Sequence, residues 1–249
     1  MDLVVSNVSH CFFQDHETAY ILRDISFSVE KGEFVSILGP SGCGKTTLLS
    51  IIAGLLKPTE GTVQKQEQIG YMLQHDFLFP WKTIGDNCGL GLKLMGKRMS
   101  ESKQIVAELL AKVGLSDTAH LYPRQLSGGM RQRAALVRTL ITDPQLLLLD
   151  ESFSALDYQN KLRLEDIVSQ LLHRTNKTAV LVTHDIEEAI AMSDRILLLS
   201  KGPSTIQKVI VIPEELRALS PLEARKHPQF LILREEIWKE LTEIEAAEN

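Results

Sequence analysis

The stretch "GPSGCGKTT", residues 39–47, constrains the fold of this chain more than any other. It matches the pattern G-x-x-x-x-G-K-[ST], follows the apolar run Phe34–Leu38 and opens a helix-like segment, "TTLLSIIAGLL". Gly42 and Gly44 let backbone N–H groups curl around phosphate oxygens, and Lys45 adds a positive charge beside a helix N-terminus. A glycine loop that arose by chance would not be expected to follow a strand and also to open a helix. The stretch therefore predicts a strand–loop–helix unit that binds nucleotide phosphates.

Short apolar runs alternate with helical segments along the rest of the chain. The runs are Phe34–Leu38, 145–150, 179–183 and 195–200, each bounded by polar or turn residues. Runs of this kind are typical of parallel strands covered on both faces. We expect an α/β fold with a P-loop NTPase core and a mainly parallel sheet.

Two regions break this alternation. Residues 3–13 and 19–30 alternate apolar and polar positions around the polar turn "QDHET" and predict an N-terminal antiparallel β subdomain. Residues 83–125 predict helices inserted between two core strands. One of these helices would be capped by Ser100 and end at Gly114, and its apolar face would consist of Ile105, Leu109 and Val113.

The end of the chain predicts one more amphipathic helix. Its apolar residues recur every three or four positions at Phe230, Leu233, Ile237, Leu241 and Ile244. We therefore divide the chain into an ATPase-type domain, 1–205, with a helical subdomain at about 83–140, and a C-terminal helical extension, 206–249.

Acidic residues follow the apolar run "LLLL". Asp150 can hold the shell of a Mg²⁺ ion, and Glu151 can polarise a water that attacks the terminal phosphate. His184 follows another apolar run and should reach the same edge of the sheet, where it could contact the γ-phosphate or the water. An acidic pair can also be a helix cap, and a lone histidine is more often structural. The preceding phosphate loop favours the catalytic interpretation.

A second anion-binding helix terminus follows at "LSGG". Ser127 is a good N-cap, and Gly128 and Gly129 leave the first helical turn bare. An ordinary cap would explain Ser127 but not two glycines, each of which weakens a helix by up to about 1 kcal/mol. We expect this terminus to close the open face of a nucleotide held by a second chain, so that a symmetric pair buries two nucleotides.

Charge and apolar content narrow the possible partners. With 27 Lys and Arg against 32 Asp and Glu, scattered along the chain, no basic face for nucleic acid is visible. Three cysteines, without the spacing of a zinc site, fit a reducing compartment. Uninterrupted apolar runs fall far short of the roughly 20 residues that cross a bilayer. We therefore expect any link to a membrane to run through a partner.

Together these motifs resemble the ATPase subunit of ATP-binding cassette (ABC) transporters. The resemblance rests on "GPSGCGKTT", "LQ" at 73–74, "LSGGMRQR", "LLLLDES", "SALD" at 154–157 and "THD" at 183–185, in the order of that family, over residues 3–205. "LQHDFLFPWKTIGDN", "LSGGMRQR" and "FLILREEIW" are similar to the importer branch for nitrate, sulfonate, taurine and related small solutes. The fold that this resemblance implies is the ABC ATPase fold.

The resemblance assigns roles to individual positions. It implies catalytic roles for Glu151, His184 and Lys45, and Mg²⁺ contacts for Thr46, Gln74 and Asp150. Phe12 would stack on adenine, unless Phe13 or Tyr20 takes that place. Of the residues implied to contact ATP, the "SGG" residues would contact the opposite chain's γ-phosphate, and Asp157 would lie at the dimer seam. The full set is Phe12, Gly39, Pro40, Ser41, Gly42, Cys43, Gly44, Lys45, Thr46, Thr47, Gln74, Ser127, Gly128, Gly129 and Asp157.

The resemblance also implies partners. A homodimer would close around two Mg-ATP and drive a membrane permease docked at residues 74–81, with an extracytoplasmic solute-binding protein acting indirectly and no nucleic acid involved. The chain would then sit on the cytoplasmic face of a bacterial-type cell membrane. The aromatic residues near Trp81 could instead be core packing.

Two other functions fit the sequence less well. A soluble ABC ATPase acting on nucleic acid or the ribosome would need a long coiled-coil insertion or a second cassette, neither of which is present. A small P-loop kinase leaves "LSGG", "SALD" and His184 without a role.

Overall fold

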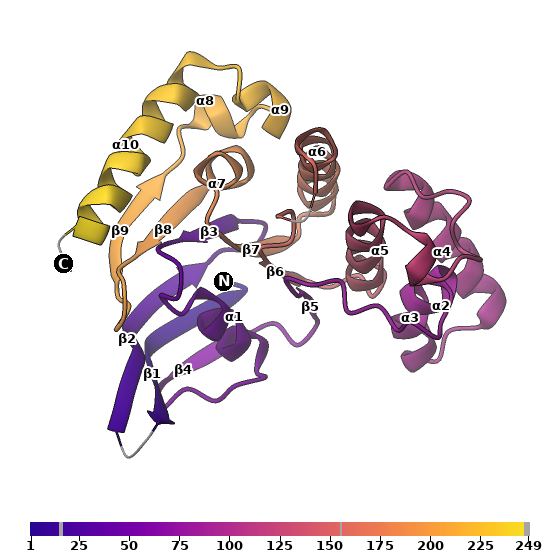
Figure 1. The fold of residues 1–249 in the computed structure, drawn as a ribbon, viewed down its shortest axis with the longest axis horizontal. Helices are drawn as coiled ribbons and strands as arrows, with labels where there is room; N and C mark the ends of the chain where they lie inside the picture. Colours follow the sequence, from indigo (N-terminus) through magenta and orange to yellow (C-terminus); the bar gives the residue numbers. More distant parts are fainter. Residues whose placement is uncertain (15–16, 155, 247–249) are drawn as a thin grey trace.

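The computed structural model of the chain describes residues 1–14, 17–154 and 156–246. Its centre is a six-stranded sheet in the order β5-β6-β7-β3-β8-β9 (Figure 1). The strands are β3 (Phe34–Leu38), β5 (Ile69–Met72), β6 (Leu146–Asp150), β7 (Thr178–Thr183), β8 (Arg195–Leu199) and β9 (Ile206–Val211). The first five in the order are parallel and β9 is antiparallel to β8. The predicted parallel core is thereby confirmed.

The central strands alternate between two cores because successive side chains of a strand point to opposite faces. Val35 and Ile37 of β3 pack with α1 (Lys45–Ala53) and the N-terminal strands. On the opposite face, Leu147 and Leu149 of β6 pack with residues of α5 (Gly128–Leu140) and α6 (Tyr158–Thr175). Burial on both faces explains why these strands read as unbroken apolar runs.

A separate antiparallel sheet in the order β2-β1-β4 covers one face of the core. It consists of β1 (Leu3–Gln14), β2 (Glu17–Val29) and β4 (Glu60–Lys65). The predicted N-terminal subdomain is confirmed, and of the predicted turn at 14–18, residues 15 and 16 lie outside the described part of the chain. Sequence reasoning missed β4 and β5, which are short and carry many polar or half-exposed residues.

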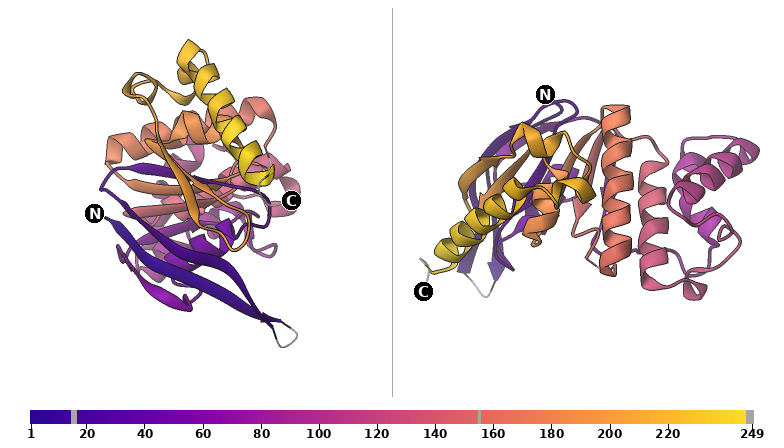
Figure 2. Two further views of the ribbon diagram at one scale, coloured as in Figure 1. Left: turned by 90° about the vertical axis from the view of Figure 1, so that its left-hand side faces the viewer. Right: turned by 90° about the horizontal axis from the view of Figure 1, so that it is seen from above.

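The predicted helical insert lies between β5 and β6. Its helices are α2 (Ile84–Cys88), α3 (Leu90–Leu94), α4 (Met99–Lys112), a 3₁₀ turn at Pro123–Gln125, and α5. In the views of Figure 1 and Figure 2 (right), α2, α3 and α4 form the end of the molecule opposite the C-terminus.

The prediction of Ser100 as the N-cap of α4 is wrong. Arg98 holds that position, and Ser100 lies within the first turn. The apolar face of α4 also lies slightly away from the predicted line, since Val106 and Leu110 are buried with Val113 while Ile105 and Leu109 are only partly buried. Gly114 follows the helix in the left-handed conformation, with φ of +71°, and ends it as expected.

The tail after residue 205 adds β9 to the central sheet before turning helical. It continues as α8 (Glu214–Arg217), α9 (Pro221–Ala224) and α10 (Pro228–Ala246). Phe230, Leu233 and Ile237 of α10 are buried against Ile196 and Leu198 of β8 and the helix α7 (Ile186–Met192). The predicted terminal helix and its apolar face are confirmed, and β9 is the element that the sequence did not reveal.

Candidate functional site

A cavity of about 620 Å³ opens where the strands β3, β6 and β7 end. Most of its residues belong to the predicted site and come from five separate parts of the chain. The lining consists of Phe12, Ile21, Ser41, Gly42, Gly44, Lys45, Thr46, Thr47, Gln74, Glu151 and His184. Ile21, on β2, was not predicted, because only the pairing of β1 with β2 brings it beside the loop.

The phosphate loop, residues 39–47, lies between β3 and α1 as its sequence requires. The buried ammonium of Lys45 donates hydrogen bonds of 2.8 Å to the carbonyls of Gly39 and Pro40. Gly44 has φ of +94°, and a Cβ there would lie 2.6 Å from the Ile21 side chain, so only glycine fits. The loop is thus held in shape by its own lysine and by close packing against β2.

Side-chain oxygens that could bind Mg²⁺ lie close together near the phosphate loop. Thr46 Oγ1 donates to Asp150 Oδ1 at 3.1 Å, and the Tyr71 hydroxyl lies 3.4 Å from Asp150 Oδ2. Burial raises the pKa of Asp150, although the Thr46 hydrogen bond partly opposes the shift. A hydroxyl and a carboxylate are ligands that Mg²⁺ prefers, so these residues fit such an ion. Among the described residues, no group of three or more His, Cys, Asp or Glu could hold a metal alone, so nucleotide phosphates would have to complete the shell.

Glu151 lies between two other polar residues of the cavity. Gln74 Nε2 donates to Glu151 Oε2 at 3.1 Å, and His184 Nδ1 lies 3.3 Å from Glu151 Oε1. Glu151 itself has φ of +44°, a strained conformation for a residue that is not glycine, and such strain is common at functional sites. A carboxylate held between an amide and an imidazole can orient a water molecule.

Phe12 is the aromatic residue that reaches the cavity. It is 44% exposed and its ring meets His10 edge-on at 4.7 Å between centroids. Tyr20 pairs with Cys11 across the sheet and so points to the opposite face, where it contacts Arg23. The side chain of Phe13 lies outside the described part of the structure. The described residues therefore favour Phe12 as the platform for a base.

Some residues assigned to ATP contact do not line the cavity. The side chain of Cys43 is fully buried in the core, where burial raises the pKa of its thiol. Gly39 and Pro40 lie behind the loop and turn their carbonyls to Lys45. These three residues are therefore buried and do not line the cavity.

Ser127, Gly128, Gly129 and Asp157 also lie outside this cavity. Ser127 caps α5 as predicted and accepts from Met130 N at 3.3 Å, and Asp157 caps α6 by accepting from Asn160 N at 3.1 Å. A Cβ on Gly129 would lie 3.0 Å from Leu156, so the turn formed by residues 127–129, here the SGG turn, lies beside the residue preceding Asp157. Ser127, Gly128 and Asp157 are exposed.

One further residue joins these parts and was not predicted. Gln132 of α5 is 2% exposed, and its Nε2 donates to Ser152 O at 2.8 Å and to Gln74 O at 3.5 Å. It therefore links the helix that follows the SGG turn to the neighbours of Glu151 and to Gln74. A buried glutamine on an otherwise apolar helical face is the signal that could have revealed it.

The parallel sheet with its phosphate loop, the antiparallel side sheet and the helical insert define an ATP-binding cassette ATPase. Comparison with known proteins then identifies the family to which the chain belongs. The family model described as "ABC transporter" matches residues 22–154. An uncharacterized ABC transporter ATP-binding protein of Bacillus subtilis, YtlC, is 56% identical over 98% of this chain and 96% of its own length. The chain belongs to the ABC transporter family.

Relatives whose names state a function are less similar to this chain. The nitrate import ATP-binding protein NrtD of Synechocystis is 37% identical over 95% of this chain and 94% of its own. The taurine import ATP-binding protein TauB of Escherichia coli K12 is 38% identical over 92% of this chain and 93% of its own length. Among solved structures, the dimeric bacterial ABC transporter cassette MJ0796 has a TM-score of 0.78 and 32% identity, covering 85% of this chain and 99% of its own.

Proposed function

We propose that this chain is the ATP-hydrolysing subunit of a membrane importer. Two copies would dimerise around two Mg-ATP and power the uptake of a small solute such as nitrate, sulfonate or taurine through a permease. The observation that carries the proposal is the separation of the site into two exposed halves. The phosphate loop, Glu151 and His184 share one cavity, whereas the SGG turn lies outside that cavity and exposes Ser127 and Gly128.

A second copy supplies what the cavity lacks. The SGG turn offers the N-terminus of the thirteen-residue α5, which attracts a γ-phosphate through its free N–H groups and its dipole. Asp157 lies next to this turn and would meet the same partner. MJ0796, with which this chain shares its fold, has a dimeric structure and another bound to ADP and Pi, which supports such a pairing.

Hydrolysis would use the residues held around Glu151. With ATP in the loop, Glu151 accepts a hydrogen bond from the attacking water and orients it toward the γ-phosphate, while His184 donates to a γ-phosphate oxygen. Thr46, Asp150 and Gln74 would hold Mg²⁺, which neutralises phosphate charge when bound. Lys45 would move from the carbonyls of Gly39 and Pro40 to the outer phosphates.

The importer assignment rests on the names of the relatives. NrtD and TauB are import ATP-binding proteins, and both match over more than nine tenths of this chain. Solute selectivity would reside in the permease and in an extracytoplasmic binding protein. No helix among the described residues is long and apolar enough to cross a membrane. We place the subunit on the cytoplasmic face of the membrane through its permease.

The surface for the permease would include the exposed side chains of Phe77 and Trp81, which are 59% and 70% exposed. Beside them, a groove of about 460 Å³ runs between α2, α3 and α4. Its floor includes Val106 and Ala119, and its rim carries Lys82, Lys93 and Lys103. A short permease helix with apolar and acidic side chains would fit this groove.

Substitution of the catalytic carboxylate tests the shared site. We expect Glu151→Gln to lower ATP turnover by about 10²–10⁴-fold, because the general base is lost, and to accumulate an ATP-bound dimer in size-exclusion chromatography with light scattering. Glu215→Gln, on an exposed surface, is the matched control. Adding Ser127→Arg to Glu151→Gln should return the protein to monomers. A Glu151→Gln variant that stays monomeric at saturating Mg-ATP would refute the shared site.

A further inference from the structure

A cluster of five charged residues lies beneath the turn that carries His184. Lys161, Glu165, Asp185, Glu188 and Arg225 come from α6, from α7 with its N-cap, and from the end of α9. The side chains of Glu165 and Glu188 are 0% and 2% exposed, and those of Arg225 and Lys161 are 9% and 12% exposed. Buried charges of this kind are costly unless each finds a partner.

The cluster holds both neighbours of His184. Lys161 Nζ donates to Asp185 Oδ2 at 2.7 Å, and the amide of Asp185 donates to Thr183 Oγ1 at 3.0 Å. The Thr183 hydroxyl in turn donates to the carboxylate of Glu188. His184 itself is 63% exposed, so its position toward Glu151 depends on these two fixed neighbours.

Two cations serve three carboxylates in this cluster. Lys161 Nζ lies 2.7 Å from Asp185, 3.6 Å from Glu188 and 4.0 Å from Glu165, so Glu165 is a competitor for the same ammonium. Arg225 neutralises that competitor, with its Nη2 2.7 Å from Glu165 Oε2. Burial still raises the pKa of Glu165 to about 7 against the pull of Arg225, a measure of how poorly solvated this carboxylate is.

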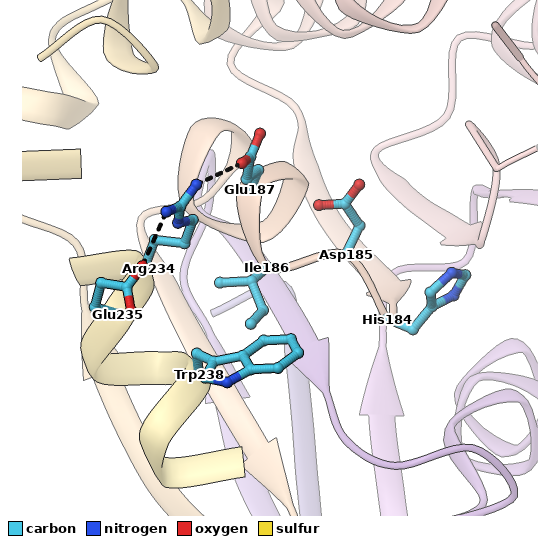
Figure 3. Close-up of a pocket in the computed structure, with 7 residues that line it drawn as sticks. All are labelled: His184, Asp185, Ile186, Glu187, Arg234, Glu235 and Trp238. Atoms are coloured by element: carbon cyan, nitrogen blue, oxygen red, sulfur yellow. Dashed lines mark hydrogen bonds and ion pairs between the residues drawn. The ribbon is translucent and has the colours of Figure 1, made fainter. Parts of the chain in front are cut away.

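Arg225 belongs to the C-terminal extension and is held firmly there. The helix α9 that precedes it has a capping box between Ser220 and Glu223, and Leu222 N donates to Asp166 Oδ1 of α6 at 3.2 Å. A second link is visible in Figure 3, where Arg234 of α10 contacts Glu187 of α7 at 3.2 Å; both residues line one side of a cavity of about 580 Å³ that His184 also lines. That second pair is at the surface, whereas the Arg225 pair is buried.

We propose that Arg225 is a positioning residue for His184: by occupying Glu165 it leaves Lys161 on Asp185, and so the C-terminal extension sets the geometry of the hydrolytic site. The proposal rests on the proposed function, in which His184 and Glu151 carry out hydrolysis. Without the guanidinium, the buried Glu165 carboxyl is neutral below its raised pKa, and above that pKa its carboxylate draws Lys161 from Asp185 and loosens the turn on which His184 stands.

The test is a rescue experiment in the full-length protein at about pH 9, above the raised pKa of Glu165, so that its carboxyl is ionised. We expect Arg225→Met to lower kcat for ATP about fivefold or more, with KM for ATP changed less than about twofold, because the phosphate loop is untouched. Adding Glu165→Gln removes the competing charge and restores kcat to within about twofold of wild type. Arg225→Lys should stay close to wild type, and Arg234→Met, which breaks the surface pair of Figure 3, is the matched control.

A packing role for Arg225 predicts a different pattern. If Arg225 only stabilised α9, Glu165→Gln would not restore turnover, and that result, or an unchanged kcat in Arg225→Met, would overturn the proposal. If Arg225→Met fails to fold, the double variant with Glu165→Gln is the test. The proposal requires this double variant to fold and to hydrolyse ATP near the wild-type rate. A second readout separates failure of this proposal from failure of the proposed function. The backbone amide NMR shifts of Asp185 and His184 should move in Arg225→Met and return in the double variant, even if the protein hydrolyses no ATP.

Discussion

At the scale of single residues, the site depends on the register of neighbouring strands. Asp150 at the end of β6 pairs with Val182 of β7, and Glu151 N donates to Val182 O at 2.8 Å. Glu151 and His184 therefore leave the sheet side by side, although 32 residues lie between them in the chain. Parallel pairing converts a distant spacing in sequence into a contact of 3.3 Å.

Glu165 makes the stability of the protein depend on pH. Its pKa is raised from an ordinary 4.5 to about 7, chiefly by burial. Between these values the folded protein keeps a proton that the unfolded chain has released, so the stabilisation is complete below about pH 4.5 and is lost as the pH rises through 7.

The variant Glu165→Gln removes this titration. We expect the free energy of unfolding of the variant, relative to wild type, to rise by roughly 3 kcal/mol between about pH 5 and pH 8, as measured by urea denaturation. The exposed Glu108→Gln should track wild type at both pH values. Parallel pH profiles for wild type and Glu165→Gln would contradict the raised pKa.

At the scale of elements, α5 connects the two halves of the site. Its N-terminus carries the SGG turn, and further along Arg131 Nε contacts Asp76 Oδ2 at 3.0 Å. Arg138 donates to the carbonyls of Asp76 and Phe77 at 2.6 and 2.8 Å, beside Phe77 in its left-handed conformation, with φ of +42°. Movement of α5 is thereby linked to the segment between Gln74 and the exposed aromatic residues.

Loss of the guanidinium should free this segment. In Arg138→Met, the carbonyls of Asp76 and Phe77 lose their charged donor, a local cost of about 2 kcal/mol. We expect amide hydrogen exchange of residues 74–81 to accelerate about 30-fold, while that of β6 and β7 is unchanged. Arg174→Met, on the exposed end of α6, is the control. Unchanged exchange in residues 74–81 would show that α5 does not hold them.

At the scale of the whole molecule, the C-terminal extension shares its core with the central sheet. Phe230 and Ile237 of α10 are 1% and 0% exposed and pack in one cluster with Leu38, Ile196 and Leu198. Figure 2 shows α10 lying along the side of the molecule formed by β8 and β9. The division at residue 205 stays a prediction about chain organisation, and we infer that the extension unfolds together with the rest.

Truncation of one side chain tests that inference. We expect Phe230→Ala to lower the free energy of unfolding by about 3–5 kcal/mol, because a buried aromatic ring leaves a cavity, and to keep a single urea transition. Its neighbour Leu231 is 52% exposed, and Leu231→Ala should change stability by less than about 1 kcal/mol. Two separate transitions in Phe230→Ala would show that the extension is an independent unit.

The sequence by itself determined the chemistry and its order along the chain. The phosphate loop, the carboxylates at the end of β6, the histidine after β7 and the cap at Ser127 are local patterns, readable because a strand, a loop and a helix start each have short-range rules. The same rules predicted the parallel core, the N-terminal antiparallel strands and the terminal amphipathic helix. They misplaced the start of α4 by two residues and missed β4, β5 and β9, whose short or half-exposed strands carry weak patterns.

The tertiary structure alone decided which of these groups meet. Ile21 against Gly44, Gln132 against Ser152 and Arg225 against Glu165 join residues from separate segments, and no local pattern encodes such contacts. Their positions follow from strand register and from the packing of helices on opposite faces of the sheet. Burial of the Glu165 carboxylate, and the resulting division of Lys161 and Arg225 among three acids, exists only once α6, α7 and α9 are packed together.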